Sequence, residues 1–390
     1  MATWRLDPDV VHLNHGSFGA CPVEVLDLQD QLRTEMEANP VAFMLRRYQP
    51  ALEQNRTAMA RFVGADPEGL VFVPNATYGV NSALRSVEGR LGPGDELVIT
   101  SHTYNACRNA VANTAERTGA RVVVADIPFP ISSADEAVAA VLAALSDHTA
   151  LLLVDHVTSP TGLRLPVEEI LAAVDPSVIT IVDGAHAPGM VDVDVATMGA
   201  SFYTANCHKW LCAPKGAAML WAAEPFRSTA VAASISHGYN DGWPGSGSRF
   251  HAQFDWTGTD DPTARLCVGL AIEVMGAHHP DGWPGIRSSN RTLALAGRRI
   301  VLEAIGAAEP APASMIGSIA SVPVPPERDP SDSIFDPLTT ALHAEWSIEV
   351  PVFAWPESPQ RLLRISAQQY NTVDDYRALA VAVAAELGRP

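Results

Sequence analysis

The sequence predicts an α/β protein built on a mostly parallel β-sheet. Short apolar runs, typical of strands buried on both faces, occur at 96–100, 121–126, 151–155 and 178–183. Longer stretches with helical periodicity alternate with them, including 134–145 and 166–173. This alternation is the pattern of parallel sheets covered by helices. The length of 390 residues and the apolar content of 47% allow a large core and two domains.

The predicted domains divide near residue 260. We expect residues 15–259 to form the large sheet domain and 260–390 a smaller C-terminal α+β domain, with 1–14 packing against the smaller one. From about Asp260 onward the strand pattern gives way to helical stretches around a proline-rich segment at 307–330. Ligands of open parallel sheets bind at the carboxyl ends of the strands. Polar clusters fall at three such ends, at 155–162, 183–189 and 206–209.

The composition argues against several classes of function. The chain has 26 basic and 44 acidic residues, a net charge of −18, which repels nucleic acid and anionic membranes. It begins without a basic segment leading into an apolar run, and no stretch reaches the roughly 20 apolar residues of a membrane span. We therefore expect a soluble, cytoplasmic protein. Its five cysteines are odd in number and lack a C-x-x-C spacing, so neither a disulfide framework nor a metal site is expected.

Lys209 stands out because the chain has 24 arginines and only two lysines. An arginine cannot form a Schiff base, whereas a lysine can be deprotonated by its surroundings and attack an aldehyde. The ordinary alternative is a surface lysine that follows a strand. The other lysine, Lys215, lies between proline and glycine in a predicted turn, and we interpret it as structural or superficial.

Asp183 is the second informative residue. It ends an apolar run, and a carboxylate at such a place is costly to bury unless a cation meets it. The pyridinium nitrogen of pyridoxal 5′-phosphate is such a cation. The alternative is an N-cap for the segment that follows. Asp183 and Lys209 lie 26 residues apart at successive strand ends, and together they indicate this cofactor more specifically than either does alone.

A phosphate site is predicted at 71–80, which has the pattern of a strand, a turn and the first turn of a helix. Free backbone amides at a helix start bind phosphate well, particularly beside a threonine hydroxyl. Ala76 and Thr77 are the candidates. A simple cap by Asn75, without any ligand, is the alternative.

Four motifs, taken together, carry a family resemblance. They are Leu-Asn-His-Gly-Ser-Phe-Gly at 13–19, Asp-His-Val-Thr-Ser-Pro-Thr-Gly at 155–162, Val-Asp-Gly-Ala-His-Ala-Pro-Gly at 182–189 and Cys-His-Lys-Trp-Leu-Cys-Ala-Pro-Lys-Gly at 207–216. With them the chain resembles class V aminotransferase-fold enzymes, specifically the isopenicillin N epimerase-like group, from about residue 13 to about 379. The resemblance implies the pyridoxal-phosphate-dependent transferase fold of type I and a homodimer whose subunits share the active site.

The resemblance also implies roles for residues around the cofactor. Lys209 would hold the cofactor as a Schiff base and then move the proton at Cα. Asp183 would pair with the ring nitrogen, and His186 would lie near the phenolic oxygen of the ring. Asn206 and His208 match positions that touch the phosphate, although several relatives have serine in place of Asn206.

Further positions complete the implied site. Tyr104, or alternatively His102, would cover the ring face opposite the lysine, where a tyrosine hydroxyl can also carry a proton. Thr259 matches a residue that reaches the phosphate of the neighbouring subunit. Arg364 would grip the substrate carboxylate with two hydrogen bonds. Candidate substrate contacts also include Ser159 and His15.

The reaction is less determined than the cofactor, because fold and cofactor do not fix it. A persulfide-forming cysteine desulfurase is discounted, because such enzymes need a cysteine on a small-domain loop and no cysteine follows Cys267. We favour cleavage of a carbon–sulfur bond by β-elimination from a cysteine conjugate in secondary metabolism, such as antibiotic biosynthesis. The alternatives are amino-acid epimerisation, transamination and decarboxylating deamination. A non-catalytic cofactor-binding protein is a remote alternative, since a decayed site would more often lack one of these residues.

Overall fold

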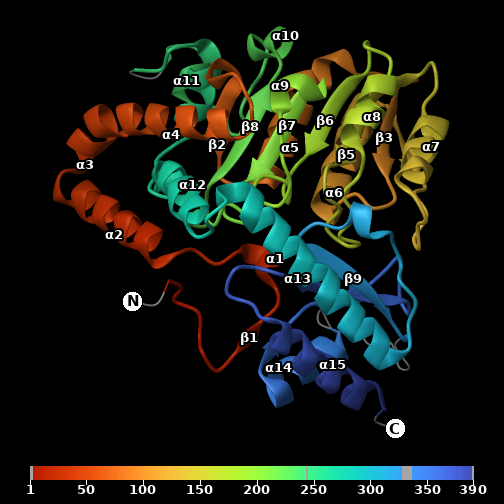
Figure 1. Cartoon of the computed structure of the whole chain (residues 1–390). Coiled ribbons are helices and arrows are strands. Elements are labelled where there is room, and N and C mark those ends of the chain that lie inside the picture. Colours follow the sequence, from red (N-terminus) through yellow and green to blue (C-terminus); the bar gives the residue numbers. More distant parts are fainter. Residues whose placement is uncertain (1–2, 243–244, 327–335, 389–390) are drawn as a thin grey trace.

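The computed structural model describes residues 3–242, 245–326 and 336–388. A seven-stranded sheet forms its centre, in the order β2-β8-β7-β6-β5-β3-β4 (Figure 1). The strands from β3 to β7 pair in parallel, and β8 is antiparallel to both β7 and β2, so the sheet is mostly parallel as predicted. The strand bounds are β2 Leu70–Val73, β3 Glu96–Thr100, β4 Arg121–Ala125, β5 Thr149–Asp155, β6 Ile179–Asp183, β7 Phe202–Asn206 and β8 Ala218–Ala222.

Helices cover both faces of this sheet, because alternate residues of the strands point to opposite sides. On one face, α5 (Ala76–Val87) and α6 (Asn105–Thr118) pack against residues such as Leu97 and Ile99. On the other, α7 (Ala134–Ala144) and α8 (Val167–Ala173) belong to the core cluster that contains Val98. Burial on both faces explains the continuous apolar runs of the inner strands. The run at 121–126 differs, because β4 is an edge strand and Val124 is exposed.

A second, smaller sheet is antiparallel, in the order β11-β12-β9. Its strands are β9 (Ile319–Val324), β11 (Val352–Ala354) and β12 (Arg361–Ser366). The helix α13 (Gly282–Ile305) packs on β9 and β12, and α15 (Val373–Gly388) packs against α13. The N-terminal strand β1 (Val11–His12) pairs with β10 (Ile348–Glu349), which ties the N-terminus to the C-terminal part. This pairing supports the proposal that residues 1–14 pack with the smaller domain.

The helix α12 (Val268–Ala277) bears on the boundary proposed near residue 260. It follows that point in sequence, yet it packs against α2 (Val23–Ala38) and α4 (Tyr48–Phe62). The contacts of α12 favour a boundary nearer the start of α13. The proline-rich segment at 307–330 contains β9, and its last residues lie outside the described part of the chain.

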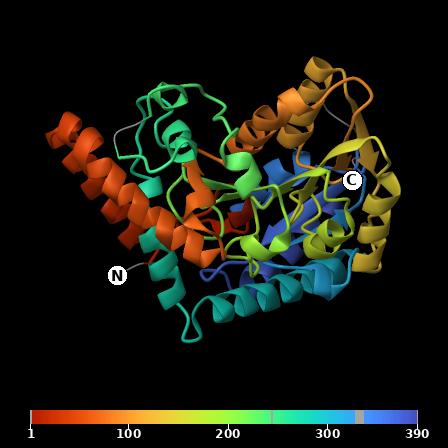
Figure 2. The same ribbon diagram turned by 90° about the horizontal axis from the view of Figure 1, so that it is seen from above.

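The remaining helices are short or lie at the periphery. Figure 1 and Figure 2 show α2 and α4 at one side of the molecule. They are joined by α3 and a π-helix at Phe43–Arg47. No helix among the described residues is long and apolar enough to cross a membrane. The other helices are α1 His15–Phe18, α3 Pro40–Ala42, α9 Val195–Met198, α10 Glu224–Arg227, α11 Arg249–Asp255 and α14 Pro337–Trp346.

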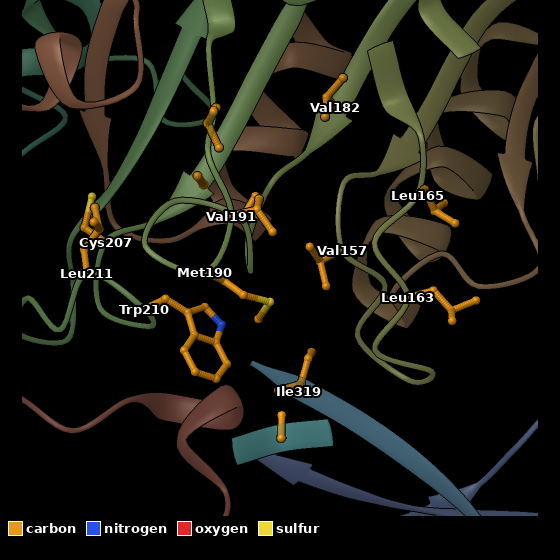
Figure 3. Close-up of a cluster of buried hydrophobic side chains, with 14 of the residues drawn as sticks. Val157, Leu163, Leu165, Val182, Met190, Val191, Cys207, Trp210, Leu211 and Ile319 are labelled. Atoms are coloured by element: carbon orange, nitrogen blue, oxygen red, sulfur yellow. The ribbon is translucent and has the colours of Figure 1, made fainter. Parts of the chain in front are cut away.

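An apolar cluster joins the large sheet to the small one (Figure 3). Trp210 and Met190 come from loops at the carboxyl ends of the large-sheet strands, and both are almost fully buried. Ile319, at the start of β9, faces them from the small sheet. The residues that follow the strand ends are therefore held between two packed sheets.

Candidate active site

Polar residues gather where three neighbouring strands end. Asp155 ends β5 and lies directly opposite Asp183, the last residue of β6, while Asn206 ends β7. Two cavities open at this edge, an inner one of about 290 Å³ and an outer one of about 720 Å³. Both cavities are lined by Ser17, Phe18, Tyr104, Ser159 and Lys209.

The inner cavity brings together most of the residues predicted to bind the cofactor. They come from four segments far apart in the sequence, at 76–77, 104, 183–186 and 206–209, which meet through the parallel sheet. Besides the residues shared with the outer cavity, its lining includes Ala76, Thr77, Asp155, Asp183, His186, Asn206 and His208.

Lys209 lies at the junction of the two cavities, with its Nζ 3.0 Å from His186 Nε2. Burial above all, helped by the charge of Arg364, lowers the pKa of Lys209 to about 8, against the opposing effect of Asp183. The neutral amine, which is the nucleophile, is then much more populated near physiological pH than in an ordinary lysine. Lys215, in contrast, is exposed.

Two glycines hold the backbone beside Lys209. Gly19 has φ +69°, and a Cβ at this position would lie 2.0 Å from the His208 carbonyl oxygen. Gly189 has φ +91°, and a Cβ there would lie 2.5 Å from the Trp210 carbonyl oxygen. Both positions need glycine for conformation and for space. The backbone around Lys209 is therefore fixed from two sides.

Asp183 is 4% exposed and fits a cationic ring nitrogen. Its Oδ1 accepts a hydrogen bond from the Ala185 amide (2.9 Å), and its Oδ2 accepts one from the Cys107 thiol (3.1 Å). Within the described residues no cationic side chain lies within ion-pair distance of it. A buried carboxylate without a cation is costly. The pyridinium of pyridoxal phosphate would remove that cost.

Asp155 places a second carboxyl group beside Asp183. The sequence predicts it only as the first residue of a polar cluster. Burial first, and then the neighbouring Asp183, hold the pKa of Asp155 well above its ordinary value. Its Oδ2 is buried and has no hydrogen-bond partner among the described residues. The pair therefore contains one carboxyl group that favours its neutral form beside one positioned to bind a cation.

The start of α5 has the Asn75 cap that was the alternative to a phosphate site, and the Ala76 amide is not free. Asn75 caps the helix by accepting from the Tyr78 amide (2.8 Å), and Asn206 Oδ1 accepts from the Ala76 amide (2.9 Å). The nearby His208 donates from Nδ1 to the Ala217 carbonyl (3.1 Å), which leaves only Nε2 for a ligand. That nitrogen can donate to a phosphate only when the ring is protonated, and the phosphate charge itself favours the protonated form.

Tyr104, rather than His102, is the aromatic residue that reaches the site. Tyr104 lines both cavities and is 46% exposed. His102 is fully buried and lines neither; its ring nitrogens are engaged by the Thr161 hydroxyl (2.7 Å) and the Ile127 carbonyl (3.1 Å). The geometry therefore favours Tyr104 as the ring-covering residue.

Arg364 lies in the wall of the outer cavity, on β12 of the small sheet. Its guanidinium donates to the carbonyl (2.7 Å) and hydroxyl (3.0 Å) of Ser159 and to the hydroxyl of Ser17 (2.9 Å). Its Nε is buried and without a partner among the described residues, and no carboxylate there forms an ion pair with it. Burial lowers its pKa to about 10, so it stays charged at neutral pH. A buried arginine that lacks an acid fits a carboxylate ligand.

Two predicted residues lie outside both cavity linings. His15 is fully buried, with Nε2 3.0 Å from the Lys209 carbonyl oxygen and Nδ1 3.0 Å from the Tyr370 hydroxyl, so it supports the lysine backbone from behind. Ser17, two residues along the same motif, faces the cavities instead. Thr259 is exposed and lines neither cavity. The role assigned to Thr259 requires a second subunit.

The family model of class-V aminotransferases matches residues 19–274. The chain belongs to this family. Among curated relatives, the isopenicillin N epimerase of Amycolatopsis lactamdurans is 34% identical, with 97% of this chain and 95% of that protein aligned. The putative L-cysteine desulfhydrase 1 of Oryza sativa subsp. japonica is 31% identical over 96% of this chain and 82% of that protein. The predicted resemblance is confirmed.

A solved structure confirms the predicted fold of this class V chain. The cysteine desulfurase CsdA of Escherichia coli superposes with a TM-score of 0.76 at 20% identity, covering 99% of this chain and 97% of that one. Family membership indicates pyridoxal phosphate as the cofactor and an enzyme as the class of protein. The buried Asp183 and the lowered pKa of Lys209 fit that cofactor.

Proposed function

We propose that this protein is a pyridoxal-phosphate-dependent carbon–sulfur lyase that acts on an S-conjugate of L-cysteine. The reaction consumes water, breaks the Cβ–S bond, and yields a thiol, pyruvate and ammonia. The observation that carries the proposal is the pair of basic side chains on one cavity: Lys209, whose amine is readily neutral, and Arg364, which lacks an acid. An α-amino acid offers its Cα proton to Lys209 and its carboxylate to Arg364.

The roles follow from where the side chains lie. Bound pyridoxal phosphate supplies an electron sink for the charge that develops at Cα. Arg364 orients the substrate by its carboxylate, which sets the bond at Cα that faces Lys209. Lys209 accepts the Cα proton, and the sulfur leaves Cβ with the electron pair of its bond and then takes up a proton. Asp183 stabilises the protonated ring nitrogen, and Ala76, Thr77, Asn206 and His208 hold the phosphate.

The outer cavity supports a substrate larger than free cysteine. Its volume of about 720 Å³ lies in the range of sites for ligands of drug size. Phe353 and Trp355 line it together with Arg108 and Arg364, so an apolar sulfur substituent would be covered on one side. Relatives named as L-cysteine desulfhydrases support the sulfur chemistry.

Epimerisation is the second candidate, and Tyr104 is the observation that favours it. Its side chain lines both cavities together with Lys209. A hydroxyl on the face opposite the lysine could return a proton to Cα and invert the centre. The isopenicillin N epimerase relatives align over almost the whole chain.

The assembly we propose is a cytoplasmic homodimer. Thr259, which is exposed in one subunit, would reach the phosphate of its partner, and the exposed Phe18 at the rim of both cavities would be covered. All five cysteines are free and buried, which fits a reducing compartment. Sedimentation of the purified protein tests the dimer.

Product analysis tests the reaction. The holoenzyme is incubated with S-ethyl-L-cysteine, its sulfoxide, L-cysteine and β-chloro-L-alanine, and pyruvate, thiol, keto acids and the D-amino acids are measured. Pyruvate and ethanethiol from the conjugate support the lyase. A D-isomer without pyruvate identifies an epimerase, and a keto acid that retains sulfur identifies an aminotransferase. Pyruvate from β-chloro-L-alanine alone would show that the site eliminates chloride from Cβ but does not cleave the Cβ–S bonds tested, which would count against the lyase.

Replacing Arg364 with glutamine should weaken substrate binding far more than cofactor binding. The variant loses a charged, two-pronged partner for the carboxylate, which we expect to lower kcat/KM about 10²-fold or more, mainly through KM. Steady-state kinetics with the best substrate measure this change. The matched control is Arg108→Gln, which alters another arginine of the same cavity. Equal KM values for wild type and the Arg364 variant would remove Arg364 from the substrate site.

A further inference from the structure

Trp210, next in sequence to Lys209, has a hydrogen bond that the roles above leave unused. Its indole Nε1 lies 3.3 Å from His186 Nδ1, and His186 Nε2 lies 3.0 Å from Lys209 Nζ. The three side chains form a chain of contacts that runs from the apolar cluster to the inner cavity. Trp210 and His186 are buried, and Lys209 is partly buried at the cavity wall.

The indole N–H can only donate, so His186 Nδ1 must accept. A neutral His186 then carries its proton on Nε2 and directs it at Lys209. A neutral amine can accept that proton, whereas an ammonium would place N–H against N–H. Burial, followed by the charge of Lys209, holds the pKa of His186 well below its ordinary value, so the ring is neutral near pH 7. A hydrogen bond donated by His186 to Nζ therefore forms only with the uncharged amine, and it stabilises that form of Lys209.

We propose that Trp210 is a positioning residue that fixes the tautomer of His186 and thereby keeps the Lys209 amine uncharged and nucleophilic for attachment of the cofactor. The inference rests on the proposed role of Lys209 as the cofactor's lysine. It extends that role, because it adds to burial and the charge of Arg364 a third contribution to the neutral amine, from a residue that touches neither cofactor nor substrate.

The packing around Trp210 holds its indole ring in one orientation, with the N–H directed at His186. The indole is 1% exposed and lies beside Met190 in the cluster that joins the two sheets (Figure 3). The ring of His15 packs against it from another side, with centroids 5.0 Å apart. Since the ring cannot turn away without disturbing this cluster, the donor stays aimed at His186.

Of the other charged and titratable groups around Lys209, some raise and some lower the pKa of its amine. Arg364 disfavours the ammonium form, whereas Asp183 and Cys107 favour it. Tyr104, Asp155 and His208 line the same cavity, and His15 bonds to the Lys209 carbonyl oxygen rather than to its amine. Among the described residues, His186 alone has a hydrogen bond to Nζ. A change of tautomer at His186 therefore acts directly on the amine.

The pH dependence of lysine labelling tests the proposal. The full-length protein, freed of cofactor, is methylated with formaldehyde and cyanoborohydride at several pH values, and peptide mass spectrometry follows Lys209 and Lys215 in the same molecules. In the wild type, Lys209 should reach half-maximal labelling near pH 8. In Trp210→Phe, His186 can adopt the other tautomer and accept from the ammonium. The midpoint of Lys209 labelling should rise by about one pH unit. At pH values below the midpoint, this corresponds to about a tenfold smaller fraction of neutral amine.

Three controls separate this effect from loose packing. Trp283→Phe removes an indole hydrogen bond elsewhere, to the Ile272 carbonyl (3.0 Å), and should leave the Lys209 midpoint unchanged. The Lys215 profile should stay constant in every variant. In a His186→Gln background, Trp210→Phe should cause no further shift, because its effect passes through the imidazole.

Two results would overturn the proposal. One is an unchanged Lys209 midpoint in a Trp210→Phe variant with wild-type circular dichroism, and the other is an equal shift in the His186→Gln background. Should the phenylalanine variant not fold, ¹⁵N spectra of histidine-labelled wild type decide, since a proton on His186 Nδ1 contradicts the assignment. These measurements involve no substrate, so a failed lyase assay leaves them unaffected.

Discussion

Replacing Lys209 with alanine should abolish covalent attachment of pyridoxal phosphate and lower kcat/KM at least about 10³-fold. The variant loses both the amine that bonds to the cofactor and the base that we propose for the Cα proton. Borohydride reduction of the holoenzyme, followed by peptide mass spectrometry, should find the cofactor on Lys209 in the wild type and on no peptide of the variant. The visible absorption band of the covalently bound cofactor should be lost in parallel.

Two lysine variants sharpen this experiment. Lys209→Arg keeps a positive charge in the site but cannot form the bond, so it should be as inactive as the alanine variant. Lys215→Arg changes the exposed lysine and should retain both the absorption band and turnover. Cofactor found on Lys215, or substantial turnover by Lys209→Ala, would refute the assignment of Lys209.

Much of the fold could be predicted because most strands of the large sheet are buried on both faces. Their apolar runs are continuous, and the predicted run at 96–100 coincides with β3. The pattern also changes near residue 260, but α12 packs back onto α4. Which helix belongs to which core depends on tertiary contacts that the local pattern does not contain.

The candidate site was predictable where one residue type carries the chemistry. Lys209 and Asp183 are examples, since a Schiff base requires a lysine and a strand-end aspartate is costly to bury without a cation. Ser17, Cys107 and Trp210 were not assigned roles, because their contacts join segments far apart in the sequence. The register of β5 and β6 could have revealed Asp155, since parallel strands bring their last residues together.

The placement of His15 and Ser17 shows the same limit. Both belong to the motif at 13–19, and a motif by itself does not show which side chain faces a cavity. The short helix α1 directs Ser17 toward Arg364 and leaves His15 beneath the Lys209 backbone. The helical geometry, in which successive residues point in different directions, decides between the two.

Replacing Asp183 with asparagine should lower kcat/KM about 10²- to 10³-fold while leaving the cofactor attached to Lys209. The amide has nearly the same shape, but it lacks the negative charge that would keep the ring nitrogen protonated. Without that proton the cofactor withdraws electrons from Cα less strongly, so the chemical step should slow more than substrate binding weakens. Steady-state kinetics should therefore show a lower kcat with a KM close to that of the wild type.

Asp155→Asn provides the matched control, because Asp155 lies directly opposite Asp183 and favours its neutral form. Neutralising a carboxyl group that is already uncharged should change kcat much less than neutralising Asp183. A comparable loss in both variants would mean that the two carboxyl groups act as one unit, with the charge shared between them. An Asp183→Asn variant as active as the wild type would instead remove Asp183 as the partner of the ring nitrogen. Its hydrogen bonds to the Ala185 amide and the Cys107 thiol would then be what offsets its burial.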